Sequence, residues 1–287
     1  RNDPLYERNG YYFNKWCGNR LSRATFIVLA LKLGQSLVSS NAPTAGFTNK
    51  YSIDFDGVDD FINLGNGTGL RPPVSGGVSL SVWCKWTDIT TATSRMFSNS
   101  SDSSGTTYYG LSCNKNTSGK LAMNTGDGTG FGANKRRTLQ TNSAVVSNNT
   151  WHHIVFVWTD ETQSNWKIYV DSVDITAVTT SGTGGVNAYT TDDAFIGKRI
   201  TASTSYANGL MDEVALFSTA LASADVTAIY NGGTPTDLSG ESDLIGYWRN
   251  GDPNGTASYP TITDDSTNSN NGTMTNMVSG DIVTDAP

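Results

Sequence analysis

The chain has 287 residues, of which 37% are hydrophobic, 10% aromatic and only 16% charged. This much apolar material with so little charge excludes an intrinsically disordered chain. The formal net charge of −7 is unevenly spread: residues 1–45 hold six Lys or Arg against two acids, and residues 46–287 hold thirteen against twenty-four. An acidic body repels phosphate backbones, so nucleic acid is excluded as the main partner.

The residues between the apolar runs indicate an all-β protein. Ser, Thr, Asn and Gly crowd these stretches, as expected for many short strands joined by turns, whereas Lys and Glu, which favour exposed helices, are scarce. The three cysteines are odd in number and lack the spacing of metal ligands. They therefore favour neither a disulfide framework nor a zinc site.

Residues 1–45 are predicted to form an N-terminal arm. Its apolar run, Ala24–Leu31, is the longest in the chain and is shorter than the ~18 residues of a membrane span, so no membrane span is predicted. Arg20 and Arg23 before this run are also typical of a signal peptide, which is the alternative. We expect the arm to be an assembly segment, because apolar side chains that lie outside the main folded body need a partner to bury them. The side chains expected to dock on a neighbouring subunit are Phe26, Ile27, Leu29 and Leu31.

Alternation of apolar and polar residues predicts the strands that follow the arm. Residues 52–64 indicate a strand, a tight turn at Gly57 and a second strand. Residues 78–86 place four apolar side chains on one face with a period of two, as in a central strand. Further strands are expected at 151–158, 166–173, 194–197 and 210–217.

One short helix is predicted after these strands. Ser223 is expected to cap it, Asp225 lies in its first turn, and Gly232 is expected to end it. Val226, Ile229 and Tyr230 would face inward. We expect this helix to plug one end of the sandwich.

Several of these segments together resemble a known family. The segments FDGVDDFINLG at 55–65, VSLSVWCKW at 78–86 and GLMDEVALFSTALASADVTAIYNGG at 209–233 look like the laminin G-like, concanavalin A-like jelly roll. The resemblance implies an all-β fold: a two-sheet antiparallel jelly-roll sandwich with one short helix, preceded here by an N-terminal extension. The sandwich is expected to span 46–287.

The tail at 244–287 resembles the opening strand of such domains, although it lies after the helix. The first and last strands of a jelly roll lie side by side, so moving one from front to back is physically easy. We therefore predict a permuted strand at 244–249, paired within the main sandwich, with Tyr247 or Trp248 buried. Tails of this kind are similar to those of tailed-phage virion structural proteins.

The titratable residues argue against catalysis. The chain has four Glu, and none has a carboxylate partner at the spacing that glycoside hydrolysis needs. Asp212 and Glu213 are adjacent in a predicted strand, where neighbouring side chains point to opposite faces. The only histidines, His152 and His153, are also adjacent, which predicts one packed inward and one surface imidazole. We expect a protein that is not an enzyme.

Two kinds of ligand site are considered. Oxygen ligands suit Ca²⁺, and the candidates are Asp59 and Asp60 in the first turn with Asp264 and Asp265 in the tail, if the two turns converge on one edge. Asp is also a good turn former, which explains these residues without an ion. Trp83, Tyr108 and Trp166 are candidates for stacking on a glycan, although such aromatics are more often core or subunit contacts.

These observations leave two classes of function. The first is a non-enzymatic virion structural protein, a capsid decoration protein or a tail or fibre component, which contacts other virion subunits through residues 1–45 and forms a homo-oligomer on the virion surface. The alternative is an extracellular or cell-surface glycan-binding module, a lectin or adhesin. The basic arm favours the first class, because a complete sandwich has no internal use for it.

Overall fold

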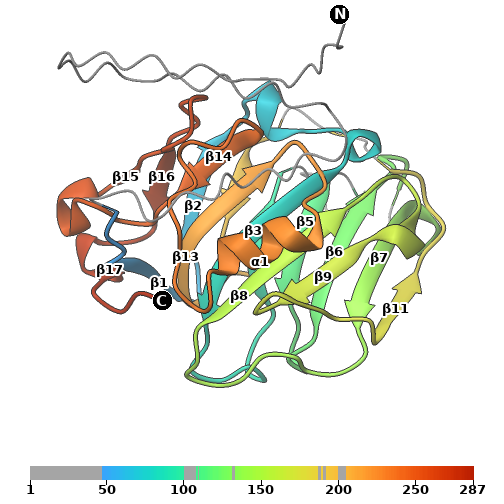
Figure 1. Ribbon diagram of the computed structural model, residues 1–287, viewed down its shortest axis with the longest axis horizontal. Helices are drawn as coiled ribbons and strands as arrows, with labels where there is room; N and C mark the ends of the chain where they lie inside the picture. Colours follow the sequence, from blue (N-terminus) through green and yellow to red (C-terminus); the bar gives the residue numbers. More distant parts are fainter. Residues whose placement is uncertain are drawn as a thin grey trace, which may run out of the picture. The chain divides into compact units, whose positions relative to one another are not determined.

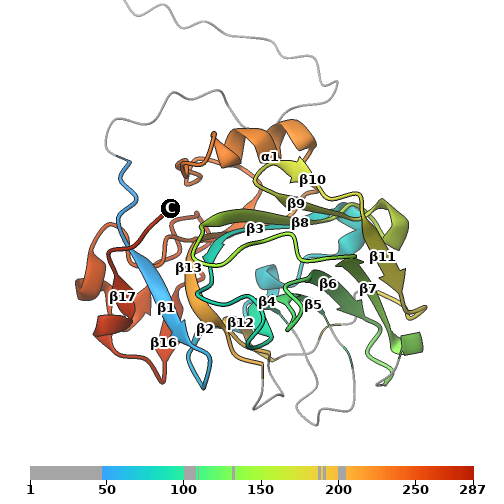
Figure 2. The ribbon, with the colours of Figure 1, turned by 90° about the horizontal axis from the view of Figure 1, so that it is seen from below.

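The computed structural model describes residues 47–99, 108, 110–130, 133–186, 189, 192–199 and 205–287. The arm at 1–45, including Phe26, Ile27, Leu29 and Leu31, lies outside the described residues, so its assembly role stays a prediction. Within the described residues, two antiparallel sheets face each other as the layers of a sandwich (Figures 1 and 2). The predicted fold class, an all-β jelly-roll sandwich with one short helix, is confirmed.

The first sheet contains eight strands among the described residues, and β13 lies near its centre. In spatial order they are β10 (Val173–Asp174), β9 (Lys167–Val170), β8 (His152–Trp158), β3 (Val78–Lys85), β13 (Asn208–Phe217), β1 (Ser52–Asp56) and β17 (Ile282–Val283), with β14 (Leu244–Trp248) also paired to β13.

The second sheet contains nine strands among the described residues. Their order is β11 (Val178–Ser181), β7 (Arg136–Thr141), β6 (Leu121–Gly126), β5 (Leu111–Lys115), β4 (Ser94–Ser98), β12 (Ala194–Ile196), β2 (Phe61–Gly65), β16 (Gly272–Thr275) and β15 (Thr261–Ile262). Short 3-10 turns lie at Thr68–Leu70, Val74–Gly76, Ala133–Lys135, Gln163–Asn165, Gly255–Ser258 and Ser279–Asp281.

The main core lies between the two sheets. Strand β3 shows why its sequence folds this way: Leu80, Val82 and Cys84 alternate along it, and all three are fully buried in that core. The facing strands β4, β5 and β6 contribute inward side chains such as Phe97, Leu111 and Met123. Burying one face of each strand is the main source of stability in such a sandwich.

The helix α1 (Ser223–Tyr230) covers the outer face of the first sheet. Val226 and Ile229 pack there with Val155, Val157 and Phe217 in a second apolar cluster. The expectation that the helix plugs one end of the sandwich is therefore wrong. This outer cluster also explains why β3 is buried on both faces.

The ends of α1 differ from the predicted caps by one residue each. The helix is capped by Ala222, whose backbone N–H donates to the Asp225 carboxylate at 3.0 Å, and not by Ser223. It ends at Asn231, which adopts the left-handed conformation expected one residue later at Gly232. Among the described residues, no helix is long and apolar enough to cross a membrane.

The tail belongs to the main sandwich. Strand β14 pairs antiparallel with β13, from Val214 opposite Trp248 to Phe217 opposite Leu244. Tyr247 and Trp248 are both fully buried. The prediction of a paired strand at 244–249 with a buried aromatic residue is confirmed, and the permutation itself stays a prediction.

Candidate functional site

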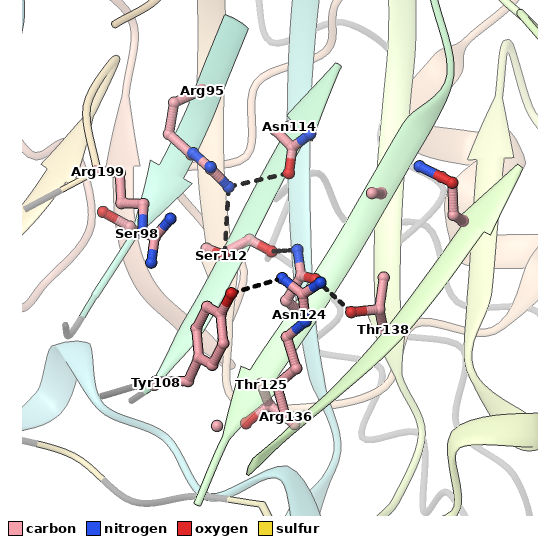
Figure 3. Close-up of a pocket in the computed structure, with 14 residues that line it drawn as sticks. Arg95, Ser98, Tyr108, Ser112, Asn114, Asn124, Thr125, Arg136, Thr138 and Arg199 are labelled. Carbon is pink, nitrogen blue, oxygen red and sulfur yellow. Dashed lines mark hydrogen bonds between the residues drawn. The ribbon is translucent and has the colours of Figure 1, made fainter. Parts of the chain in front are cut away.

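A polar pocket lies on the face of the second sheet that is turned away from the core (Figure 3). It has a volume of about 230 Å³ and is built mainly on β4, β5, β6 and β7. The residues that line it are Arg95, Ser98, Tyr108, Gly110, Ser112, Asn114, Ala122, Asn124, Thr125, Gly126, Arg136, Thr138, Gln140 and Arg199.

Strand alternation produces the polar floor of this pocket. Leu111 and Cys113 of β5 point into the core, so Ser112 and Asn114 between them point outward into the pocket. Neighbouring strands repeat the pattern. On β7, Thr138 Oγ1 donates to Asn124 Oδ1 at 2.6 Å. The floor therefore presents fixed hydroxyl and amide groups, which are the groups that orient a polar ligand.

Three arginines surround this floor. Arg95 is the most buried: its Nη1 donates to Asn114 Oδ1 at 2.9 Å and to Ser112 Oγ at 3.4 Å, and its Nε has no acceptor. Burial, and to a smaller extent the charge of Arg199, lower the pKa of Arg95 to about 10. None of the ion pairs between described residues involves Arg95, Arg136 or Arg199. The pocket is thus a cationic site on an acidic protein.

Tyr108 supplies the aromatic surface of the pocket. Arg136 Nη1 donates to its hydroxyl at 3.0 Å, and the Arg136 guanidinium lies 4.8 Å from the ring centre. The Arg199 guanidinium lies 5.4 Å from the same centre. Tyr108 is half-buried. Of the three residues predicted to stack on a glycan, it is the one that lines the pocket.

The other two predicted stacking residues are core residues, so that interpretation of them is wrong. Trp83 is 3% exposed because α1 covers it, with its ring stacked 5.9 Å from that of Tyr230. Trp166 is 2% exposed, packs edge-on against Trp158 and donates its Nε1–H to the Asp160 carbonyl oxygen. Neither ring can present a face to a sugar.

The predicted calcium ligands do not converge. The carboxylates of Asp59 and Asp60 lie with that of Asp56 in one cluster, in which their oxygens are within 4.8 Å of one another. Burial raises the pKa of Asp60 to about 6. Asp264 instead lies beside Asn270, whose N–H donates to it at 2.7 Å, before the start of β16.

Strand β16 separates the two turns. Its Thr273 pairs with Asn63 and its Thr275 with Phe61, so the Asp264 turn and the Asp59 turn lie at opposite ends of the strand. Asp264 also accepts N–H bonds from Tyr247 and Ser266, and neighbouring Asp265 follows in the same turn. Asp264 and Asp265 are thus turn residues, and the single site shared with Asp59 and Asp60 is not formed.

Comparisons with known proteins agree with this architecture. A family profile described as the concanavalin A-like lectin/glucanases superfamily, of laminin G type, matches residues 56–227. The chain belongs to this superfamily. The resemblance of the strand and helix segments to it is confirmed, and the search of curated proteins found no match.

Solved structures similar to this superfamily member include a proposed carbohydrate-binding protein from Bacteroides ovatus, with a TM-score of 0.54 and 16% identity over 84% of this chain and 60% of its own. This chain therefore spans about 60% of the length of that protein. A SAP-like pentraxin from Limulus polyphemus has a TM-score of 0.45 and 14% identity over 66% of this chain and 86% of its own. The CBM40 domain of a Ruminococcus gnavus sialidase, solved with α2,3-sialyllactose, has a TM-score of 0.45 and 13% identity over 62% and 97%. At these identities the likeness concerns the fold alone.

Because the superfamily's name includes glucanases, the buried acids of this member need a structural account. Strand alternation predicts that Asp212 and Glu213 point to opposite faces, and this prediction is wrong. A β-bulge on β13 between Asp212 and Ala215 interrupts the alternation. Both carboxylates lie in one buried cluster, where burial and then the charge of Glu213 raise the pKa of Asp212. They are 0% and 2% exposed, so a saccharide cannot reach them.

The predicted surface imidazole, His152, belongs to a hydrogen-bonded chain that resembles a catalytic triad. His152 Nδ1 lies 2.7 Å from Asp171 Oδ2, and its Nε2 lies 3.0 Å from Ser147 Oγ. Nε2 also accepts the backbone N–H of Ser147 at 3.0 Å. Its lone pair is therefore already used and cannot freely take a proton from the hydroxyl, so the chain of bonds fixes a turn.

Sequence reasoning did not find the pocket, although two signals for it were present. Polar residues alternate with apolar ones at 111–114, and Lys135, Arg136 and Arg137 form the one basic cluster of the acidic body. What joins these segments is the order of strands β4 to β7 in the sheet. That order, together with the pairing of β4 with β12, was needed to bring Arg95 into one pocket with Arg136 and Arg199.

Proposed function

We propose that this protein is a non-catalytic, lectin-like carbohydrate-binding module and that the polar pocket on β4–β7 binds a glycan with an acidic group. The observation that carries the proposal is the set of three arginines over a floor of hydroxyl and amide groups, with no carboxylate among the described residues paired to them. Hydroxyl and amide groups suit sugar hydroxyls, and guanidinium groups suit a carboxylate or sulfate.

The superfamily supports this proposal at the level of the fold, since its name includes lectins and a similar structure is described as a proposed carbohydrate-binding protein. Such a module acts outside the cell or on a particle surface. A virion role through residues 1–45 is compatible with glycan binding and rests on the sequence of the arm alone.

Titration calorimetry with two matched oligosaccharides tests the proposal. One ends in glucuronic acid and the other in glucose, so that they differ by one carboxylate. We expect binding of the acidic sugar and at least tenfold weaker binding of the neutral one, because a hydrogen bond to a charged group contributes about 1.5–3 kcal/mol. The Arg136→Gln and Arg199→Gln variants should each weaken binding of the acidic sugar by about tenfold or more.

Lys167→Gln is the matched control, because Lys167 pairs with Asp174 on the other sheet and touches no pocket residue. It removes the same charge and should leave the affinity unchanged. Equal binding of both sugars by wild type and by all variants would refute the preference for an acidic glycan, but it would leave the proposal of a carbohydrate-binding module intact. Absence of binding to a broad glycan array would refute the module itself.

A further inference from the structure

A lysine beside the polar pocket has no acidic partner among the described residues. Lys198 follows β12 and directly precedes Arg199, which lines the pocket (Figure 3). The pairing of β12 with β4 continues past the end of β12, because the Gly197 N–H donates to the Met96 carbonyl at 3.2 Å. The backbone of Lys198 therefore lies level with Arg95 of β4, on the side of the pocket nearest to β2.

The side chain of Lys198 lies over aromatic rings on the outer face of the second sheet. Its Nζ is 4.0 Å from the centre of the Phe61 ring, 5.3 Å from that of Phe195 and 5.7 Å from that of Tyr206. The neighbours of Phe61 in β2 and of Phe195 in β12 point into the core, so these two rings point outward. They pack edge-on, with their centres 5.5 Å apart. The ammonium group thus lies on the same outer face as the pocket.

The charge of Lys198 is available to a ligand. None of the ion pairs between described residues involves Lys198, and its Nζ has no hydrogen-bond acceptor among them. Burial lowers the pKa of Lys198. Lys198 and Tyr206 are both half-buried, so part of each side chain is open to solvent. The negative faces of the rings attract the ammonium group in place of a carboxylate, and its N–H donors stay free for an external anion.

The position of this lysine suits a ligand that has more than one acidic group. Lys198 Nζ lies over rings of β12 and β2, whereas Arg95 comes from β4 and Arg136 from β7. Neighbouring strands are about 4.8 Å apart, so β2 lies about 10 Å from β4. One acidic group at the arginines cannot also reach the far side of β12, but the next sugar units of a chain can. The cations form a row across the six strands from β7 to β2.

We propose that Lys198 and Tyr206 form a second subsite beside the pocket, and that the ligand is a linear glycan with acidic groups on successive sugar units. This inference rests on the proposed function and narrows the ligand from a glycan with one acidic group to a polyanionic chain. One acidic group would bind at the arginines of the pocket. A carboxylate or sulfate of a following unit would accept hydrogen bonds from Lys198 Nζ, and the Tyr206 ring would contact the sugar that carries it.

Calorimetry with two β-1,4-linked trisaccharides tests this subsite. One consists of three glucuronic acid units, and the other has glucuronic acid at its non-reducing end followed by two glucose units. They have the same length and linkage and differ only in the acidic groups that would lie beyond the pocket. Wild type should bind the triacidic sugar at least tenfold more tightly, because it gains a charge-assisted hydrogen bond to Lys198. Three equivalent acidic units would by themselves give a statistical gain of only about threefold.

Variants identify the group that is responsible. Lys198→Gln should bind both trisaccharides with the affinity that wild type has for the singly acidic one. Lys198→Arg keeps a cation over the rings and should keep the preference. Arg136→Gln should weaken binding of both sugars, because it changes the pocket itself. Lys167→Gln, on the other sheet, is the matched control and should behave as wild type. Equal Tm values would show that all variants are folded.

The two proposals fail in different ways. The subsite is overturned if wild type binds the two trisaccharides equally. It is also overturned if Lys198→Gln keeps the preference, which is the result expected if the lysine only shields Phe61 and Phe195 from water. In both cases, binding of the singly acidic sugar would leave the pocket as proposed. Binding of neither trisaccharide would instead overturn the acidic-glycan pocket, and the subsite with it.

Discussion

The stability of the protein should fall at mildly acidic pH because of one buried imidazole. His153 is fully buried beside the rings of Trp83 and Tyr230, whose centres lie 5.0 and 6.1 Å from the centre of its own ring. Its Nε2 lies 2.7 Å from Ser81 Oγ, and its Nδ1 has no partner. Burial lowers the pKa of His153 to about 3, although the nearby charge of Asp171 acts in the opposite direction. A histidine exposed on unfolding titrates near 6.5.

The difference between the two pKa values gives the sign and size of the effect. Between about pH 6.5 and about pH 3 the unfolded chain binds a proton at this residue and the folded chain does not, so stability is lost as the pH falls. The loss approaches about 1.4 kcal/mol per pH unit, or about 2.5 kcal/mol between pH 7 and pH 4.5. That is a large part of the 5–15 kcal/mol, roughly, that stabilises a typical domain.

Urea unfolding of wild type and His153→Gln, followed by tryptophan fluorescence at both pH values, measures this effect. The glutamine keeps an acceptor for Ser81 and does not titrate, so the variant should lose about 2.5 kcal/mol less than wild type on acidification. Other acids that titrate in this range, such as Asp60, contribute equally to both proteins. Val157→Ala, on the same face of β8, is the control: it should destabilise at both pH values without changing the difference. Equal pH dependence in wild type and His153→Gln would refute the low pKa.

Two further predictions concern segments singled out in the sequence. If the turn of Asp56, Asp59 and Asp60 binds Ca²⁺, calorimetry of the wild-type protein should show a calcium-binding step that Asp59→Asn removes, and a titration that is the same in both proteins would exclude the turn. Deletion of residues 1–45 should leave a soluble sandwich with a nearly unchanged Tm and a loss of self-association in light scattering, whereas aggregation or unfolding of the truncated protein would show that the arm belongs to the core.

The sequence predicted local structure better than sites, for a physical reason. Alternation at 78–86 predicted β3, because which face a side chain takes depends only on its neighbours in the chain. Whether that face is exposed depends on what covers it. Trp83 is covered by α1, which begins 140 residues later in the sequence, and alternation within β3 cannot show such a contact. The bulge at Asp212 likewise depends on the pairing of three other strands. Arg95 and Arg199 meet only because β4 pairs with β12.

The acidic pair of β13, Asp212 and Glu213, lies where one edge of that strand changes partners. One edge of β13 carries two partners in succession, and a ladder of backbone bonds cannot continue through the point where β1 stops and β14 begins. Side chains replace the ladder there: Asp252 accepts the N–H groups of Lys50 and Tyr51, and Glu213 holds Arg249 and Tyr247. Carboxylates placed where backbone amides lack partners are therefore what allows the tail to join the sheet beside β1.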